Sequence, residues 1–298
     1  MNLEQDISKP SPIEDLLLFK SGEFSSINKV LESSVNKIYL PDGIYVDPSL
    51  DRIRDLEEIR VDRSSQVVLS GGSAHKVSFL NLYYRNHNGE YSIPVASKFY
   101  SQNQSGAKEL LKMRKVSSLG ISVFPPLMFL KYQDHAYLFT KTNFSVVSLD
   151  RYNWGDLYDE SSNNHDTSKA MLEGIAKSLS KIHSLKICHG DSQLKNFVVD
   201  LKGKVKIVDW EASVFRRNMN IEELAIKDLS ILYKSCIGLY ENATNSLFKG
   251  KSISSWNMFK YLIIEPYIIS LMYMGVKLDK DFEDKLISNM KTVLSVSF

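Results

Sequence analysis

The segment at residues 189–196, which reads HGDSQLKN, constrains the fold of this chain more than any other part of the sequence. It is followed by two short β-prone runs within residues 197–208, which predict a hairpin. Because a hairpin returns the chain to its starting point, Asp209 is expected beside Asp191 and Asn196. Three oxygen-bearing side chains would then converge, as in sites that hold Mg²⁺ on phosphates and orient an attacking hydroxyl.

The sequence before this segment predicts a small lobe of β-strands with one helix. Short β-prone runs are separated by turn residues, and Asn86 to Gly89 reads as a hairpin turn. An amphipathic pattern at residues 106–116 predicts the helix, placed after the third strand. The five expected strands lie near residues 67–69, 77–84, 91–99, 123–130 and 135–140.

The remainder of the chain predicts a larger, mainly helical lobe. Apolar residues recur at helical spacing in residues 170–183, so one face of that helix is expected to be buried and to deliver the chain to residue 189. Further helices are expected at residues 222–240 and 257–276. The fold class is therefore α+β, with an N-terminal extension at 1–60, a small nucleotide-binding lobe at 61–140 and a large catalytic lobe at 141–298.

Composition excludes several other classes of protein. The 298 residues contain 37 Lys plus Arg against 35 Asp plus Glu, so the net charge of +2 predicts no nucleic-acid partner. The two cysteines, Cys188 and Cys236, form neither a CxxC pair nor a ligand cluster, which favours a reducing cytoplasm over a disulfide framework. The apolar stretch at 259–276 is interrupted by Lys260, Glu265 and Pro266, so we expect a buried helix and no transmembrane segment.

The catalytic segment resembles a known group of enzymes over most of residues 66–240. The pattern HGDxxxxNF at residues 189–197, followed by Asp-Trp-Glu at 209–211, is similar to the catalytic and metal-binding loops of the aminoglycoside phosphotransferase and choline kinase group. It is also similar to bacterial lipopolysaccharide-core sugar kinases, and residues 226–233 resemble a later Asp-containing helix of those kinases. This resemblance implies a two-lobed, protein-kinase-like fold, with ATP and Mg²⁺ as cofactors and GTP as an open alternative to ATP.

The resemblance also implies roles for individual residues. Asp191 matches the catalytic-loop aspartate, while Asn196 and Asp209 match the metal-binding residues. In the other interpretation, these are ordinary turn and strand-end residues. His189 is expected to be structural, and Asp228 is expected to support the catalytic loop from a helix. For Glu211 the expectation stays open between a weak metal ligand and a solvated carboxylate.

The signals in the small lobe are less specific. Lys98 resembles the strand lysine that grips ATP phosphates, and Glu109 on the next helix is its expected ion-pair partner. The phosphate-covering loop is expected within residues 70–76, where Gly71, Gly72 and Ser73 would bind the nucleotide through backbone amides. This loop departs from GxGxxG, and an ordinary hairpin turn is the alternative.

Three functions remain after these arguments. The first is a kinase that phosphorylates a hydroxyl of a small molecule or a glycan. The second is a protein Ser/Thr kinase, which is disfavoured because Gln193 stands where such kinases carry a lysine and because only eighteen residues separate Asp209 from Asp228. The third is a nucleotide-binding pseudokinase, which the presence of all three catalytic-site residues disfavours. The pair Arg216 and Arg217 would suit an anionic acceptor such as a phosphorylated sugar, and ordinary solvated surface arginines are the equal alternative.

Overall fold

The computed structural model describes residues 18–20, 24–26, 43–46, 56–69, 77–86, 89–132, 134–142, 147–152, 154, 165–200, 202–247 and 255–295. The chain divides into two compact units. Unit 1 comprises residues 1–114 and 124–144, and unit 2 comprises residues 115–123 and 145–298. Among the described residues, none of the helices combines the length and apolar composition that crossing a bilayer requires.

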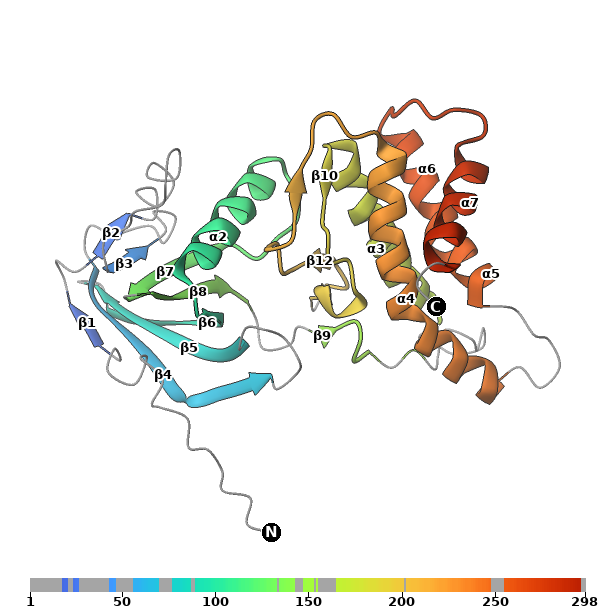
Figure 1. The fold of residues 1–298 in the computed structure, drawn as a ribbon. Helices are drawn as coiled ribbons and strands as arrows, with labels where there is room; N and C mark the ends of the chain where they lie inside the picture. The colour runs from blue at the N-terminus through green and yellow to red at the C-terminus, as the bar shows by residue number, and fades with distance from the viewer. Residues whose placement is uncertain are drawn as a thin grey trace, which may run out of the picture. The chain divides into compact units, whose positions relative to one another are not determined.

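Unit 1 is built on an eight-stranded sheet with the order β1-β4-β5-β6-β8-β7-β3-β2 (Figure 1). Neighbouring strands are antiparallel except β2 and β3, which are parallel. The predicted hairpin is present, because Asn86 pairs with Gly89 at the turn between β5 and β6. The strands are β1 Leu18–Lys20, β2 Phe24–Ser26, β3 Gly43–Val46, β4 Leu56–Leu69, β5 Val77–Asn86, β6 Gly89–Tyr100, β7 Pro126–Tyr132 and β8 His135–Lys141.

Helix α2 (Asn103–Ser118) begins just after β6 and its first turns pack against the sheet (Figure 1). Gly106 permits a close approach there, because a Cβ at this position would lie 2.8 Å from the Tyr100 ring and 3.2 Å from the Phe129 ring. The sheet has a core of buried apolar side chains from five of its strands: Val46, Leu80, Leu82, Val95, Leu127, Met128, Leu130, Tyr137 and Phe139. Strands β1 to β3 join the same sheet although they lie within residues 1–60.

Unit 2 is mainly helical, and the predicted α+β fold class is confirmed. Helix α3 (His165–Ser184) packs against α4 (Ile221–Leu247) and α6 (Glu265–Tyr273), and α4 also contacts α7 (Phe282–Ser295) (Figure 1). The predicted face of α3 is buried, with Leu172, Ile175 and Leu179 in the interior. The short strands of unit 2 are β9 Val147–Ser148, β10 Ile187–Cys188, β11 Phe197–Val199, β12 Val205–Ile207 and β13 Val214–Phe215.

The helix predicted at 257–276 differs in detail. It consists of α5 (Ser255–Phe259), a π-helical turn at Lys260–Ile264, and α6. Pro266 lies in the first turn of α6, where its missing N–H removes one α-helical hydrogen bond. The helix ends at Tyr273 in a Schellman motif, since Gly275 has a φ of +75° and Val276 N–H donates to the Leu271 carbonyl at 3.1 Å.

Candidate active site

The carboxylate of Asp191 is held by two amide groups of its own loop. Gln193 Nε2 donates to Asp191 Oδ1 at 2.7 Å, and Asn196 Nδ2 donates to Asp191 Oδ2 at 2.9 Å. The same Asn196 nitrogen donates to the main-chain carbonyl of Asp191 at 2.7 Å. The orientation of the carboxylate is therefore fixed, and Oδ1 of Asn196 is the amide atom left to offer a cation.

The hairpin after this loop forms as the sequence predicts. Strands β11 and β12 pair antiparallel, and Val208 N–H donates to the Asn196 carbonyl at 2.9 Å. The next residue is Asp209, whose φ of 61° is left-handed. Aspartate is one of the few residues besides glycine that adopts this conformation, at a cost of order 1 kcal/mol. The backbone thus turns sharply at Asp209, directly beside the end of the catalytic loop.

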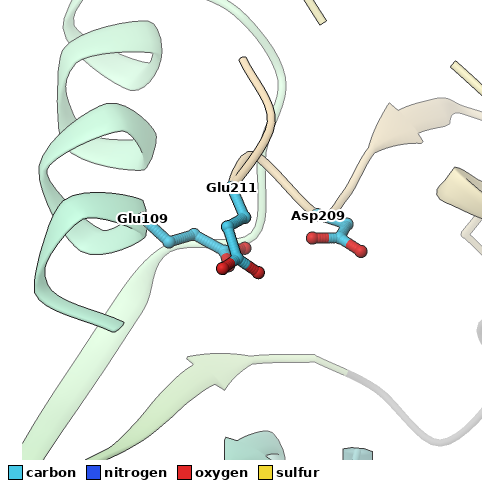
Figure 2. Close-up of side chains that lie close together, drawn as sticks. All are labelled: Glu109, Asp209 and Glu211. Atoms are coloured by element: carbon cyan, nitrogen blue, oxygen red, sulfur yellow. The ribbon is translucent and has the colours of Figure 1, made fainter. Parts of the chain in front are cut away.

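Asp209 and Glu211 together provide the carboxylates of the segment that follows β12. Figure 2 draws both side chains, and one oxygen of each lies within 4.8 Å of the other. Trp210 between them is fully buried, and its Nε1 donates to the Ile207 carbonyl at 3.2 Å. Mg²⁺ prefers oxygen ligands such as carboxylates and amide carbonyls, and a backbone hydrogen bond from Val208 joins Asn196 to the residue just before Asp209. The donor set of these residues therefore fits a magnesium ion.

Gly190 brings the catalytic loop against the carboxylate segment. Its φ is +82°, and a Cβ at this position would lie 2.6 Å from the carbonyl oxygen of Ala212. A second link runs between strands β10 and β13, which pair Cys188 with Val214. Because only glycine permits both this backbone conformation and this contact, Gly190 fixes how the loop of Asp191 lies against the segment that carries Asp209.

His189 has the structural role that the sequence predicts. Its Nε2 lies 3.1 Å from the Val208 carbonyl, which can only accept, so Nε2 carries the proton. The ring is fully buried and meets Trp210 edge to face, with ring centroids 5.2 Å apart. Among the described residues its Nδ1 atom has no hydrogen-bond partner. The imidazole thus joins the catalytic loop to the end of β12, and its contacts lie within the protein core.

Asp228 on α4 supports the catalytic loop, as predicted. It is fully buried and accepts backbone N–H groups from both His189, at 2.7 Å, and Gly190, at 2.8 Å. The hydroxyl of Ser192 donates to the main-chain carbonyl of Asp228 and also lies near Oδ1 of the same aspartate. His183 Nε2 on α3 lies 3.0 Å from Oδ2. A single carboxylate therefore anchors the residues on both sides of Asp191.

The charge of Asp228 is stabilised by these donors. Burial raises the pKa of this carboxyl, but hydrogen bonds from His183 and the Gly190 amide, together with the nearby imidazoles, outweigh burial and lower the pKa to about 2. Burial and the negative charge of Asp228 raise the pKa of the Cys188 thiol to about 12. The carboxylate is therefore ionised at neutral pH, while Cys188 stays a neutral thiol without nucleophilic character.

The sequence did not indicate two supports of this loop. In the sequence, Gln193 marks only a difference from protein kinases, which carry a lysine at this position. Its amide is two residues after Asp191, and this spacing could have suggested a contact with the Asp191 carboxylate. Tyr267 on α6 extends the network, since its hydroxyl lies 2.8 Å from Nδ1 of His183. That contact joins positions 84 residues apart, and no local pattern marks it.

Unit 1 contains the predicted ion pair. Lys98 Nζ lies 2.8 Å from Glu109 Oε2, and the Tyr100 hydroxyl donates to the same oxygen at 2.6 Å. Lys98 lies on β6, opposite Val77 of β5, and Glu109 is buried on α2. The three nucleotide-binding residues predicted in the loop between β4 and β5, Gly71, Gly72 and Ser73, lie outside the described residues. The roles of Lys98 and Glu109 toward a nucleotide stay predictions.

The family comparison agrees with the resemblance of the catalytic segment to lipopolysaccharide-core sugar kinases. A solved structure described as WaaP in complex with acyl carrier protein is similar at 12% sequence identity and a TM-score of 0.45, covering 76% of this chain and 87% of that chain. No curated protein matches the sequence. The family model described as lipopolysaccharide kinase (Kdo/WaaP) matches residues 72–251, which is more than half of the 298 residues. The chain therefore belongs to the lipopolysaccharide kinase (Kdo/WaaP) family and has its protein-kinase-like fold.

Proposed function

We propose that this protein transfers the γ-phosphate of ATP, with Mg²⁺, to a hydroxyl group of a sugar in the lipopolysaccharide core. Membership of the kinase family supports a phosphotransferase activity. The observation that carries the proposal is the geometry of Asp191, whose carboxylate is oriented by two amide donors beside the turn at Asp209. A fixed carboxylate next to metal-binding oxygens is the arrangement that phosphoryl transfer requires.

Each predicted site residue of unit 2 has a distinct role in this proposal. Asp191 orients the acceptor hydroxyl and takes its proton as the oxygen attacks the γ-phosphorus, while the bond from that phosphorus to the bridging oxygen breaks and ADP leaves. Oδ1 of Asn196 and the carboxylate of Asp209 would hold Mg²⁺, with Glu211 as a further candidate ligand. The cation supplies charge neutralisation for the transferring phosphoryl group. Asp228 acts through the backbone, because it fixes the loop on both sides of Asp191.

Unit 1 supplies the nucleotide site in this proposal. Lys98 binds ATP phosphates, and its contact with the buried Glu109 holds the ammonium group in place. The loop with Gly71, Gly72 and Ser73 covers the phosphates through backbone amides. Residues 61–140 act as the nucleotide-binding lobe, residues 141–298 as the catalytic lobe and residues 1–60 as an extension. The cytoplasm, where ATP is available, is the proposed location.

A sugar acceptor is favoured over a protein side chain by the length of the segment after Asp209. Strand β13 occupies Val214–Phe215, and α4 begins at Ile221. A protein kinase uses a much longer segment at this place to order and bind a substrate peptide. The short connection here leaves no comparable platform within the described residues, which supports a compact hydroxyl acceptor.

The function is tested by incubating purified protein with ATP and Mg²⁺ and with separate acceptors: lipopolysaccharide core oligosaccharide, simple sugars, amino alcohols and generic protein substrates. We expect phosphate on a core sugar, detected by mass spectrometry, and none on Ser or Thr of the proteins. Phosphorylation of proteins alone would favour the protein kinase. Nucleotide binding without transfer to any acceptor would favour the pseudokinase.

The metal ligands give a second prediction. Asp209→Asn keeps a residue that tolerates positive φ but removes the charge that attracts Mg²⁺. We expect the gain in nucleotide affinity on adding Mg²⁺ to fall at least roughly tenfold, since even indirect partners of metal ligands change affinity by about 10- to 100-fold. Calorimetry with and without Mg²⁺ measures this gain. The control is Asp279→Asn, an exposed carboxylate outside the site; equal metal dependence in both variants would show that Asp209 is not a ligand.

A further inference from the structure

One part of unit 2 is strongly basic although the whole chain is nearly neutral. Four segments, at residues 115–123, 181–188, 212–220 and 271–278, contain no Asp or Glu. All of their cations are exposed or half-buried, and they are Lys115, Lys181, Lys186, Arg216, Arg217 and Lys277. These four segments are called the basic surface below. Such separation of charge creates a local positive potential that the net charge of +2 conceals.

Direct contacts join the four segments into one continuous region. Lys115 Nζ lies 4.0 Å from the centre of the Phe215 ring, which connects the first segment to the third. Lys181 Nζ donates to the Gly120 carbonyl, which connects the first to the second. The backbone N–H of Arg216 donates to the carbonyl of Lys186 at 2.9 Å, which connects the third segment to the second.

The fourth segment is attached through the end of α3. The Ser184 hydroxyl lies 3.8 Å from the sulfur of Met274. Each of the four segments therefore contacts at least one of the others within unit 2, and together they form one connected region.

The basic surface also exposes large apolar side chains. Met272 is 63% exposed and Tyr273 is 88% exposed at the end of α6, and Met274, Leu119 and Leu185 are each exposed by about two fifths, with values of 41%, 40% and 38%. Isolated exposed apolar residues are ordinary on a protein surface. Here they lie in the same segments as six cations and no carboxylates. Cations that attract anionic headgroups and apolar side chains that enter the layer below are the two components of interfacial membrane binding.

We propose that the basic surface docks this protein onto an anionic lipid surface. Strand β10 begins directly after Lys186 and leads to the catalytic loop, so Asp191 lies five positions after this lysine. A fully extended chain of that length spans about 17 Å. Docking through this surface therefore holds the catalytic loop close to the headgroup layer. The inference does not depend on the proposed reaction, because it concerns binding alone.

The test is flotation of the full chain with vesicles of phosphatidylcholine alone or of phosphatidylcholine mixed with phosphatidylglycerol, without nucleotide. We expect binding to the anionic vesicles, weaker binding to the neutral ones, and release as salt is raised. Each basic residue near an anionic surface contributes about fivefold to affinity, so Arg216→Glu with Arg217→Glu should weaken binding by at least roughly tenfold. Met272→Ser with Tyr273→Ser tests the apolar part and should weaken binding to the same vesicles.

The matched control is Lys202→Glu with Lys204→Glu, which makes the same change of charge at the exposed tip of the β11–β12 hairpin. It should bind like the parent, and thermal unfolding of each variant establishes that it is folded. If the control and the arginine variant lost vesicle binding equally, the net charge of the chain alone would explain binding, and the proposal would be overturned. Absence of vesicle binding by the parent would also overturn it, and would leave an acidic protein as the partner that this charge pattern fits.

Discussion

Asp191→Asn is expected to lower kcat for phosphate transfer by roughly 10²- to 10⁴-fold, the range over which a positioned general base contributes. The substitution keeps the size of the side chain but removes its ability to accept the hydroxyl proton. Nucleotide affinity should change little, because the proposed phosphate ligands lie elsewhere. Steady-state kinetics with the phosphorylated acceptor as readout, together with nucleotide titration, separates the two effects.

This variant needs a check of its fold, because both oxygens of Asp191 accept amide N–H groups in the parent. An asparagine presents its own N–H₂ to one of these donors, so a small loss of thermal stability is expected. The control is Asp279→Asn, which should retain the parent's kcat. Turnover at the parent rate in a folded Asp191→Asn protein would remove Asp191 from the mechanism and with it the main support for the proposed function.

Asp228→Asn is expected to lower the free energy of unfolding by about 2–4 kcal/mol, because a buried acceptor of several N–H groups is replaced by a group that must point a donor at one of them. The backbone N–H groups of His189 and Gly190 occupy both carboxylate oxygens in the parent. No orientation of an amide can satisfy both. Chemical denaturation measures the change, and a difference below about 0.5 kcal/mol, typical of surface substitutions, would contradict this role.

The same residue predicts a dependence on acid. The pKa of Asp228 is lowered from 3.8 to about 2 in the folded protein. The stabilisation from its ionised form is therefore complete above about pH 4 and is lost as pH falls through about 2. Between these values the parent should lose more stability than Asp228→Asn, which has no carboxyl group to protonate. Parallel losses would mean that other carboxyl groups dominate acid unfolding.

Local patterns predicted the elements that carry their own signals. The hairpin at β11 and β12, the strands on either side of α2 and the buried face of α3 all follow from alternation, turn residues or helical spacing. Helix α7 carried a signal too and was not predicted: Phe282, Leu286, Met290 and Leu294 are buried at intervals of four residues. That spacing is sufficient to identify an amphipathic helix.

Other features depend on contacts between distant residues and had no local signal. Strands β10 and β13 contain two residues each, which is too short for any periodicity to appear. Their pairing lies beside the close approach of Gly190 to Ala212, a contact between positions far apart in the sequence. The role of Asp228 could be expected from the family resemblance, but its partner His183 and the link to Tyr267 required the positions of three helices. The sequence thus predicted candidates for the reacting groups, whose roles stay predictions, but it did not predict most of the residues that hold them in place.

The anchoring of the catalytic loop by α4 has a consequence for the order in which the enzyme matures. The acceptor for the His189 amide lies 39 residues later in the chain. During synthesis, the whole segment HGDSQLKN therefore emerges from the ribosome before Asp228 is available to anchor it. A nascent chain that ends before Ile221 contains Asp191, Asn196 and Asp209 without the carboxylate that orders their loop. The loop can therefore become ordered only after translation has passed α4, and under the proposed function we expect unfinished chains to lack phosphotransferase activity.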